Sequence, residues 1–232
     1  MTVDINDDLQ SSIQQEFKII AELKMIQKEH IGGVYVIPSY ESSFVWFGVL
    51  FVRAGYYSDG IFRFNISLPK DFPNTTDVPT VIFQSELMHP LICPYTGIVN
   101  ISDAFPTWNP SEHHLWQLLK YIRFIFAHPI ACLSNDSIKI SNREAANLLR
   151  EQKISEFEEK VKECVRISKD KIYDDPPTDD KHYITFSVFD DEIHRNVLEN
   201  IKSKPDGIST SASPPPSGLS WVNEGEFQAL RK

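Results

Sequence analysis

Four short apolar runs between residues 34 and 83 constrain the fold of this chain most strongly. The pattern is clearest in the third run, where apolar residues alternate with polar ones at Phe62, Phe64, Ile66 and Leu68. A period of two is typical of a β-strand with one buried side. The other runs, rich in β-branched and aromatic residues, cover 34–37, 44–53 and 80–83. Because short loops join consecutive runs, they predict a four-stranded antiparallel meander with one apolar and one wet face.

Helical patterns flank these runs on both sides. Residues 11–29 predict an amphipathic helix whose apolar stripe contains Ile13, Phe17 and Ile20, widened by Ile19, Leu23 and Ile26. Its predicted polar face includes Glu22. Residues 112–126 predict a second helix, apolar around most of its circumference and therefore buried on several sides, with Trp116 in the core. A third helix is expected to begin at Asn142 and to run to about Tyr173.

The fold class is therefore α+β, with one domain over residues 11–173 and an extension over 174–232. The extension holds eleven acidic and six basic residues and the run Pro214-Pro215-Pro216. This composition predicts a largely disordered tail, with a helix near 186–201 where apolar residues recur at helical spacing. Trp221 and Phe227 are exposed aromatic candidates for anchoring a protein partner.

Charge and cysteine usage narrow the function further. A net charge of −9 argues against sequence-independent nucleic-acid binding, which needs a basic face. The three cysteines, Cys93, Cys132 and Cys164, lie far apart and show no Cys-x-x-Cys spacing, so we expect neither disulfide nor zinc. Adjacent histidines in Glu112-His113-His114 point about 100° apart on a helix, so they predict a helix start and no metal site. We expect no cofactor, no membrane span and a cytoplasmic protein.

One segment, residues 87–110, carries a spaced set of motifs: His89-Pro90, then Gly97, then Trp108-Asn109-Pro110. It resembles the active-site segment of ubiquitin-conjugating enzymes, in which a nucleophilic Cys follows the Gly by three residues and precedes the Trp by eight. The order of the predicted elements also resembles that fold across residues 11–173. The resemblance implies an N-terminal helix, a four-stranded meander, a buried central helix and C-terminal helices.

The nucleophile is missing at the aligned position. Counting three forward from Gly97 and eight back from Trp108 both give Asn100, whereas counting from His89 alone gives Val99. Ubiquitin transfer needs a thiolate, and an amide side chain supplies no comparable nucleophile. The family's oxyanion-stabilising Asn, a donor worth roughly 3 kcal/mol in comparable sites, is replaced by Leu91. The degenerate site is therefore His89, Pro90, Leu91, Asn100 and Trp108, with His89 in a structural role, and the chain is predicted not to be an enzyme.

The run His128-Pro129, the phrase from Pro176 to Ile184 and the phrase from Gly218 to Phe227 resemble the inactive variants of the fused-toes and crossbronx type. This resemblance implies a protein-binding adaptor that works with Hook-type coiled-coil proteins and is peripheral on vesicles through its partners. One alternative is a variant that binds ubiquitin non-covalently or pairs with an active conjugating enzyme. Another is an enzyme that uses Cys93 as a displaced nucleophile, although the sequence around Cys93 gives no sign of an activated thiol.

Overall fold

The computed structural model describes residues 5–133 and 139–203. The chain divides into two compact units, Met1–Ser187 and Val188–Lys232. The first unit holds the sheet and the helices around it. Trp221 and Phe227, the aromatic candidates of the tail, lie outside the described residues.

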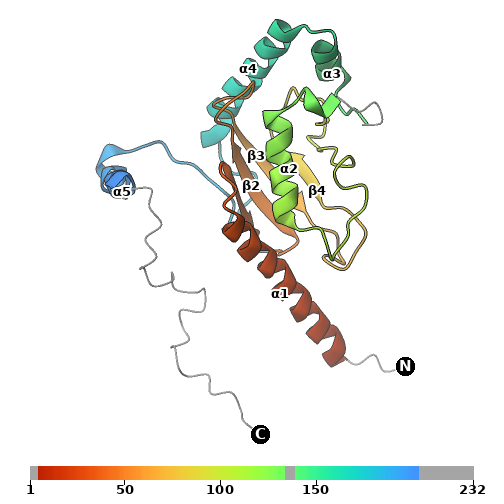
Figure 1. The fold of residues 1–232 in the computed structure, drawn as a ribbon. Coiled ribbons are helices and arrows are strands. Elements are labelled where there is room, and N and C mark those ends of the chain that lie inside the picture. The colour runs from red at the N-terminus through yellow and green to blue at the C-terminus, as the bar shows by residue number, and fades with distance from the viewer. Residues whose placement is uncertain (1–4, 134–138, 204–232) are drawn as a thin grey trace. The chain divides into compact units, whose positions relative to one another are not determined.

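The predicted meander is confirmed. Its strands are β1 (Val34–Pro38), β2 (Val45–Phe51), β3 (Ile61–Ser67) and β4 (Thr80–Phe83), paired antiparallel in the order β1-β2-β3-β4 (Figure 1). The alternation in β3 has the expected result, because Phe62, Phe64 and Ile66 are buried while Arg63 and Asn65 point to the other face.

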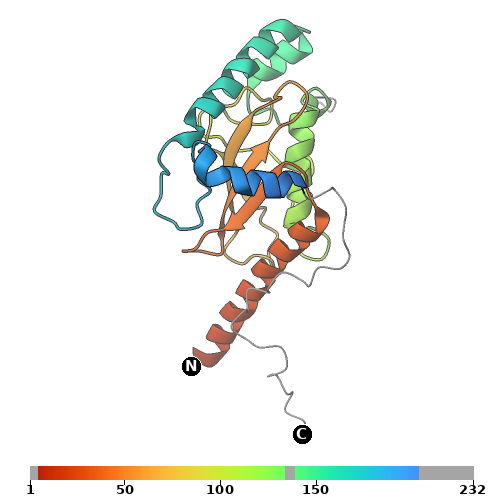
Figure 2. The same ribbon diagram turned by 90° about the vertical axis from the view of Figure 1, so that its left-hand side faces the viewer.

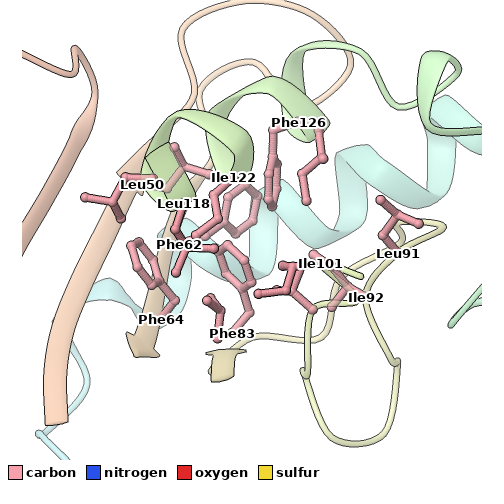
Figure 3. Packing of buried hydrophobic residues seen from close by; sticks show 14 of the residues in the cluster. Leu50, Phe62, Phe64, Phe83, Leu91, Ile92, Ile101, Leu118, Ile122 and Phe126 are labelled. Atoms are coloured by element: carbon pink, nitrogen blue, oxygen red, sulfur yellow. The ribbon is translucent and has the colours of Figure 1, made fainter. Parts of the chain in front are cut away.

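Helix α2 (Leu115–Ala127) covers the apolar face of the sheet. In the core between them, the Phe126 ring lies 5.6 Å from Phe62 and 5.2 Å from Phe83, between ring centroids (Figure 3). The prediction for Trp116 is wrong: its side chain is only partly buried, and the Lys120 ammonium lies 4.3 Å from the centre of its ring. Trp116 points away from the face of α2 that meets the sheet, so it packs at the edge of the core.

Helix α1 (Ile5–Glu29) begins earlier than predicted and turns a different side to the core. Ile19 and Ile26 are buried, but Phe17 is 68% exposed and Ile13 and Ile20 are exposed beside it. Glu22, expected in water, is only 5% exposed. The apolar residues of α1 form two rows about 100° apart. Because the Glu22 carboxylate bonds to the start of α2, only the row that contains Ile19 and Ile26 can face α2.

The expected single helix from Asn142 to Tyr173 is two helices, α3 (Arg143–Arg150) and α4 (Ile154–Asp170), followed by a 3-10 turn at Lys171–Tyr173. Asn142 caps α3 by accepting the N–H of Ala145. The break is at Gln152, whose φ of 57° ends the helix, while the N–H of Lys153 bonds back to the carbonyl of Leu148. No glycine or proline marks this ending, so the sequence pattern missed it.

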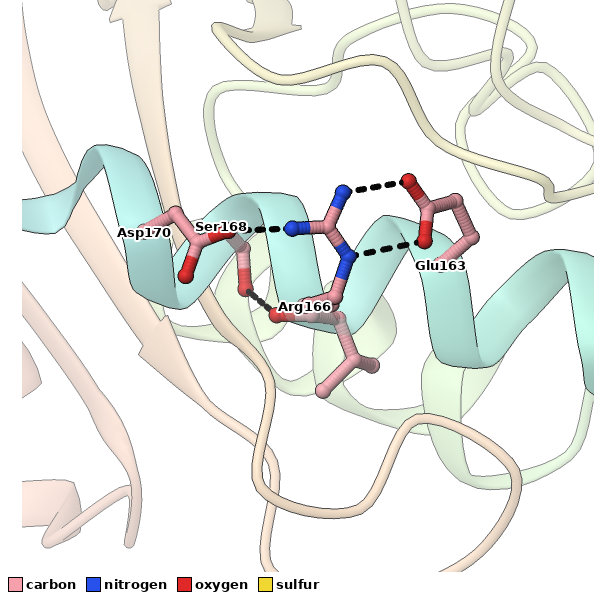
Figure 4. A network of polar contacts seen from close by, with 5 residues as sticks. Glu163, Arg166, Ser168 and Asp170 are labelled. Atoms are coloured by element: carbon pink, nitrogen blue, oxygen red, sulfur yellow. Dashed lines mark hydrogen bonds and ion pairs between the residues drawn. The ribbon is translucent and has the colours of Figure 1, made fainter.

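A buried side chain joins helix α4 to the sheet. Ser168 is buried; its hydroxyl donates to Val165 and accepts the N–H of Ile61 at the start of β3. On the exposed side, Arg166 pairs with Glu163 and Asp170 one turn away in each direction (Figure 4). The exposed pairs add little stability, whereas the Ser168 contact sets where α4 meets β3.

The compact unit continues past the predicted boundary at Tyr173. Residues 174–187, which we call the strap, lie on the outer face of the sheet, opposite α2, and the side chains of Asp180 and Tyr183 are buried there. That side of the sheet faces the viewer in Figure 2. In the second unit, the helix predicted near 186–201 is present as α5 (Asp191–Ser203). All of its larger apolar residues except Leu198 are exposed: Ile193, Val197 and Ile201.

Candidate functional site

Residues 92–99 form a tight loop anchored on β4. Cys93 and Ile98 face each other, the N–H of Cys93 bonding to the Ile98 carbonyl at 2.9 Å, and the N–H of Gly97 returns to Cys93. Gly97 has a φ of +70°, and a Cβ atom there would lie 2.0 Å from the carbonyl oxygen of Phe83. Only glycine fits this approach. Gly97 therefore fixes the loop against β4, and with it the position of Asn100 three residues later.

His89 is fully buried beneath this loop. Its Nδ1 accepts the N–H of Leu91 at 3.1 Å, and its Nε2 lies 3.1 Å from the carbonyl oxygen of Ile125 in α2. A neutral ring with its proton on Nε2 satisfies both bonds. Burial lowers the pKa of His89 to about 4, so the ring is neutral at physiological pH. Both nitrogens serve the backbone, and neither is available as a general base.

Leu91 places an apolar side chain where the resembled family has an amide donor. The side chain is 1% exposed and points into the core beside Ile92 (Figure 3). The backbone of Leu91 is used as well, because its carbonyl accepts the N–H of Asn100 at 2.7 Å. The carbonyl of the preceding Pro90 accepts the N–H groups of Ser141 and Asn142. Pro90 thus joins the active-site-like segment to the start of α3, and Leu91 bonds within the segment to Asn100 without offering a side-chain donor.

The side chain of Asn100 is held on both ends. Its Nδ2 donates to the carbonyl of Lys139, and its Oδ1 accepts from the N–H of Ser102 at 3.1 Å and from the Ser102 hydroxyl at 2.7 Å. An amide can donate and accept at once, so Asn100 links two loops that a thiol could not link equally well. The residue at the aligned nucleophile position acts here as a crosslink between residues 100–102 and residue 139.

Trp108, near the end of the segment, is a buried core residue. It is buried against Phe72 and Phe105, with ring centroids 5.8 and 5.7 Å away, and its backbone N–H bonds to Thr76 at 2.9 Å. Within the described part of the chain, its indole N–H has no hydrogen-bond partner. Its position agrees with the core-packing interpretation made from the sequence.

Cys93 has a feature that sequence reasoning missed. The hydroxyl of Thr96 and the backbone N–H groups of Thr96 and Tyr95 stabilise its thiolate and lower the pKa of the thiol. Tyr95 beside it is 95% exposed. The signal lies in the turn sequence Cys-Pro-Tyr-Thr-Gly, which brings these donors back toward the sulfur. The thiol is thus more acidic than an ordinary one, but Cys93 lies opposite Ile98 in the loop, whereas Asn100 lies opposite Leu91.

The histidines before α2 serve the helix start. His113 Nδ1 accepts the N–H of Asn109 at 3.0 Å, and His114 contacts Glu22. Over residues 5–133 and 139–203, no group of three or more His, Cys, Asp or Glu side chains could hold a metal ion. A search of the same residues found no helix that combines the length and the apolar character needed to cross a membrane.

The sheet, the buried central helix and the His89–Trp108 segment define a ubiquitin-conjugating fold, and comparison with known proteins agrees. Residues 14–165 match the family model described as ubiquitin-conjugating enzyme, and the chain belongs to this family. Two solved structures share the fold: a putative ubiquitin conjugating enzyme from Plasmodium yoelii (TM-score 0.56, 21% identity, 66% of this chain and 94% of that one) and the E2 domain of a Toxoplasma gondii ubiquitin conjugating enzyme (TM-score 0.54, 22% identity, 66% and 97%).

Within the family, the chain is of the crossbronx type. It is 49% identical to the protein crossbronx homolog of Culex quinquefasciatus, with 100% of this chain and 99% of that protein covered. It is 46% identical to the homolog of Anopheles gambiae, with complete coverage of both, and 46% identical to protein crossbronx of Drosophila willistoni, with 99% of each covered. The similarity therefore includes the strap, α5 and the tail.

Proposed function

We propose that this chain is a catalytically inactive member of the ubiquitin-conjugating family that works by binding other proteins. The observation that carries the proposal is the Asn100 crosslink. At the position where the family has its nucleophile, a side chain without a nucleophile is bonded to Lys139 and Ser102. Leu91, buried beside it, offers no donor for an oxyanion. Two separate catalytic requirements are unmet in one segment.

The partner class comes from the fused-toes resemblance: a Hook-type coiled-coil adaptor in the cytoplasm, with the complex peripheral on vesicles. Two exposed apolar rows support a binding role. One is Ile13, Phe17 and Ile20 on α1, and the other is Ile193, Val197 and Ile201 on α5. Rows of this spacing are what a helix presents to a partner helix or groove. Trp221 and Phe227 of the tail are further candidate anchors.

A charging assay tests the loss of catalysis. The full chain would be incubated with activating enzyme, ATP and ubiquitin, beside an active conjugating enzyme as the positive control. We expect no thiol-sensitive ubiquitin adduct. Because the pKa of Cys93 is lowered, the assay includes Cys93→Ala. An adduct that forms on the unmodified chain and is lost in Cys93→Ala would overturn the proposal and identify a displaced nucleophile.

A quantitative pull-down tests the adaptor role. The baits are the full chain, the full chain with Phe17→Ser and Ile20→Ser, and the full chain with Trp221→Ala and Phe227→Ala. We expect a coiled-coil adaptor in near-stoichiometric amount with the full chain and less of it with one of the two variants. Recovery of that adaptor with none of the baits would contradict the partner class.

The alternative is a variant that binds ubiquitin non-covalently or pairs with an active conjugating enzyme. The match of residues 14–165 to the ubiquitin-conjugating family is the observation that favours it. Titration of isotope-labelled ubiquitin with the full chain distinguishes the two functions. Saturable shifts on one ubiquitin surface would support the alternative, whereas an unchanged spectrum at millimolar concentration would exclude ubiquitin as its ligand.

A further inference from the structure

The strap is attached to the sheet through a buried carboxylate. Asp180 accepts hydrogen bonds from the Ser39 hydroxyl at 2.5 Å and from the backbone N–H groups of Tyr40, Glu41 and His182 at 3.1, 3.3 and 2.8 Å. Burial raises the pKa of this carboxyl, but the four donors outweigh it and lower the pKa to about 2. The β1–β2 turn therefore forms a small anion-binding cup, and the strap fills it.

Two aromatic side chains follow this carboxylate at intervals of three residues. The Tyr183 hydroxyl donates to Gln84 Oε1 at 2.6 Å, and its ring meets Phe47 edge-on at 5.1 Å. The Phe186 ring meets Phe51 in the same way at 6.0 Å. Because Phe47 and Phe51 are both on β2, the strap runs along this strand with its side chains set into the outer face of the sheet.

Arg63 of β3 contacts both aromatic rings of the strap. Its guanidinium carbon lies 5.6 Å from the Tyr183 ring centroid and 5.4 Å from that of Phe186, and its Nη2 donates to the Ile172 carbonyl at 2.8 Å. Its Nε is buried and, among the described residues, has no hydrogen-bond acceptor. A groove of about 510 Å³ beside it is lined by Arg63, Asn65, Gln84, Lys171 and Tyr183, among others. With the strap in place, the Nε donor of Arg63 is therefore enclosed and unused, and only displacement of the strap would open it to a ligand group.

The contacts on the sheet side belong to a rigid frame. Phe47, Phe51 and Arg63 are held by strand pairing, and Ser39 and Gln84 directly follow β1 and β4. These residues offer three kinds of contact to a bound segment. The β1–β2 turn binds a carboxylate, Phe47 and Phe51 each pack against an aromatic ring, and Arg63 contacts both rings. Such an arrangement recognises a short segment by side chains that are three residues apart, with a turn between the carboxylate and the first aromatic residue.

We propose that the outer face of the sheet is a binding site for a short segment of a partner protein, with a carboxylate followed at three-residue intervals by two aromatic residues, and that the strap occupies this site as an internal competitor. The preferred partner segment carries a further acidic group that reaches Arg63 Nε, which the strap does not satisfy. The partner gains access when the strap is displaced. This proposal is independent of whether the chain can be charged with ubiquitin.

A fluorescence anisotropy titration tests the site. The probe is a labelled synthetic peptide of residues 176–188, and the receptors are the full chain and the full chain with Asp180→Ala, Tyr183→Ala and Phe186→Ala. We expect the triple variant to bind the peptide at least ten-fold more tightly than the unmodified chain, because its own strap no longer competes. Adding Arg63→Ala or Ser39→Ala to the triple variant should weaken binding at least ten-fold. A peptide of the same composition in scrambled order is the matched control.

A folded triple variant, by circular dichroism, that binds the peptide no better than the scrambled control would overturn the proposal. Equal affinity with and without Arg63→Ala would overturn the role of the arginine. If the triple variant does not fold, Asp180→Asn takes its place, because it keeps the shape of the side chain and removes only its charge. Trypsin cleavage after Lys181 is the second readout: an excess of the same peptide with Lys181→Gln, which trypsin does not cut, should accelerate it in the unmodified chain, and no acceleration at saturating peptide would contradict displacement of the strap.

Discussion

The carboxylate of Glu22, in the middle of α1, accepts the backbone N–H of Leu115, the first residue of α2, at 2.8 Å. The other oxygen of the same carboxylate lies 2.9 Å from His114 Nδ1. Helix α2 has no acidic residue in its own first turn, so a residue from another helix supplies the negative charge that a helix start favours. This contact also sets the rotation of α1, since Glu22 faces α2 only when Ile13, Phe17 and Ile20 face away from it.

Glu22→Ala should therefore cost far more stability than the loss of an exposed residue on the predicted polar face of this helix. We expect the free energy of unfolding to fall by about 2–3 kcal/mol, because the buried N–H of Leu115 and the partly exposed ring of His114 lose their acceptor. Glu29→Ala is the matched control on the same helix, where an exposed pair with Lys120 should contribute less than ~0.5 kcal/mol. Urea unfolding of both variants measures the difference, and equal losses would contradict the capping role.

Much of the fold could be predicted from the sequence because its strands and its central helix have clear local patterns of apolar residues. The alternation in β3 and the β-branched runs located all four strands, and the apolar circumference of residues 112–126 located α2. Spacing from Gly97 and Trp108 located the Asn100 segment. These signals are local, since each is a period or a count along the chain.

The errors have a different origin. The orientation of α1 depends on Glu22 meeting Leu115, 93 positions away, and the pattern of α1 alone fits either apolar row. The break at Gln152 lacks the glycine that usually marks a left-handed residue. The strap was assigned to the tail because of its acidic composition, yet Asp180 is the acidic residue that the sheet binds. For α1 and the strap, a contact distant in sequence decided the structure, and no local pattern encodes it.

Gly97→Ala should disrupt the loop at the site. At a φ of +70°, a side chain is strained, and its Cβ would collide with the Phe83 carbonyl. We expect a loss of more than about 2 kcal/mol in thermal or urea unfolding. Gly32→Ala is the control, because a Cβ there meets nothing within 4 Å. A Gly97→Ala protein as stable as Gly32→Ala would show that the loop can move away from β4 without cost.

The buried neutral His89 predicts a pH dependence of stability. Unfolded His binds a proton below about pH 6.5, while folded His89, with its pKa lowered to about 4, does not. The unfolded state therefore gains protons first, and stability falls as pH drops from 6.5 to 4, by ~3 kcal/mol from this residue. Urea unfolding at pH 7.5 and pH 4.5 measures the loss. His89→Gln cannot titrate, so its loss should be smaller; an equal loss would assign the effect to other groups.

Replacing Ile122 with Ala should cost more stability than replacing Trp116 with Ala, although Trp116 is the larger residue. Ile122 is a fully buried residue of α2, and Ile122→Ala should lower the free energy of unfolding by about 2–5 kcal/mol. Trp116→Ala removes a larger side chain but mainly a partly exposed ring and its contact with Lys120, so we expect about 1–2 kcal/mol. Thermal unfolding of the two variants, with the same melting conditions, ranks them. A larger loss for Trp116→Ala would place the indole in the core after all.

Asn100→Cys returns a thiol to the aligned nucleophile position, and we expect it not to restore ubiquitin transfer to lysine. The thiol still faces Leu91, whose buried side chain cannot donate to an oxyanion, a deficit of about 3 kcal/mol in comparable sites. The substitution also removes the crosslink to Lys139 and Ser102, so stability should fall by about 1–3 kcal/mol. Asn100→Ala is the control, with the same loss of crosslink and no thiol. Single-turnover discharge of Asn100→Cys to free lysine at the rate of an active conjugating enzyme would show that position 91 is not what separates this chain from catalysis.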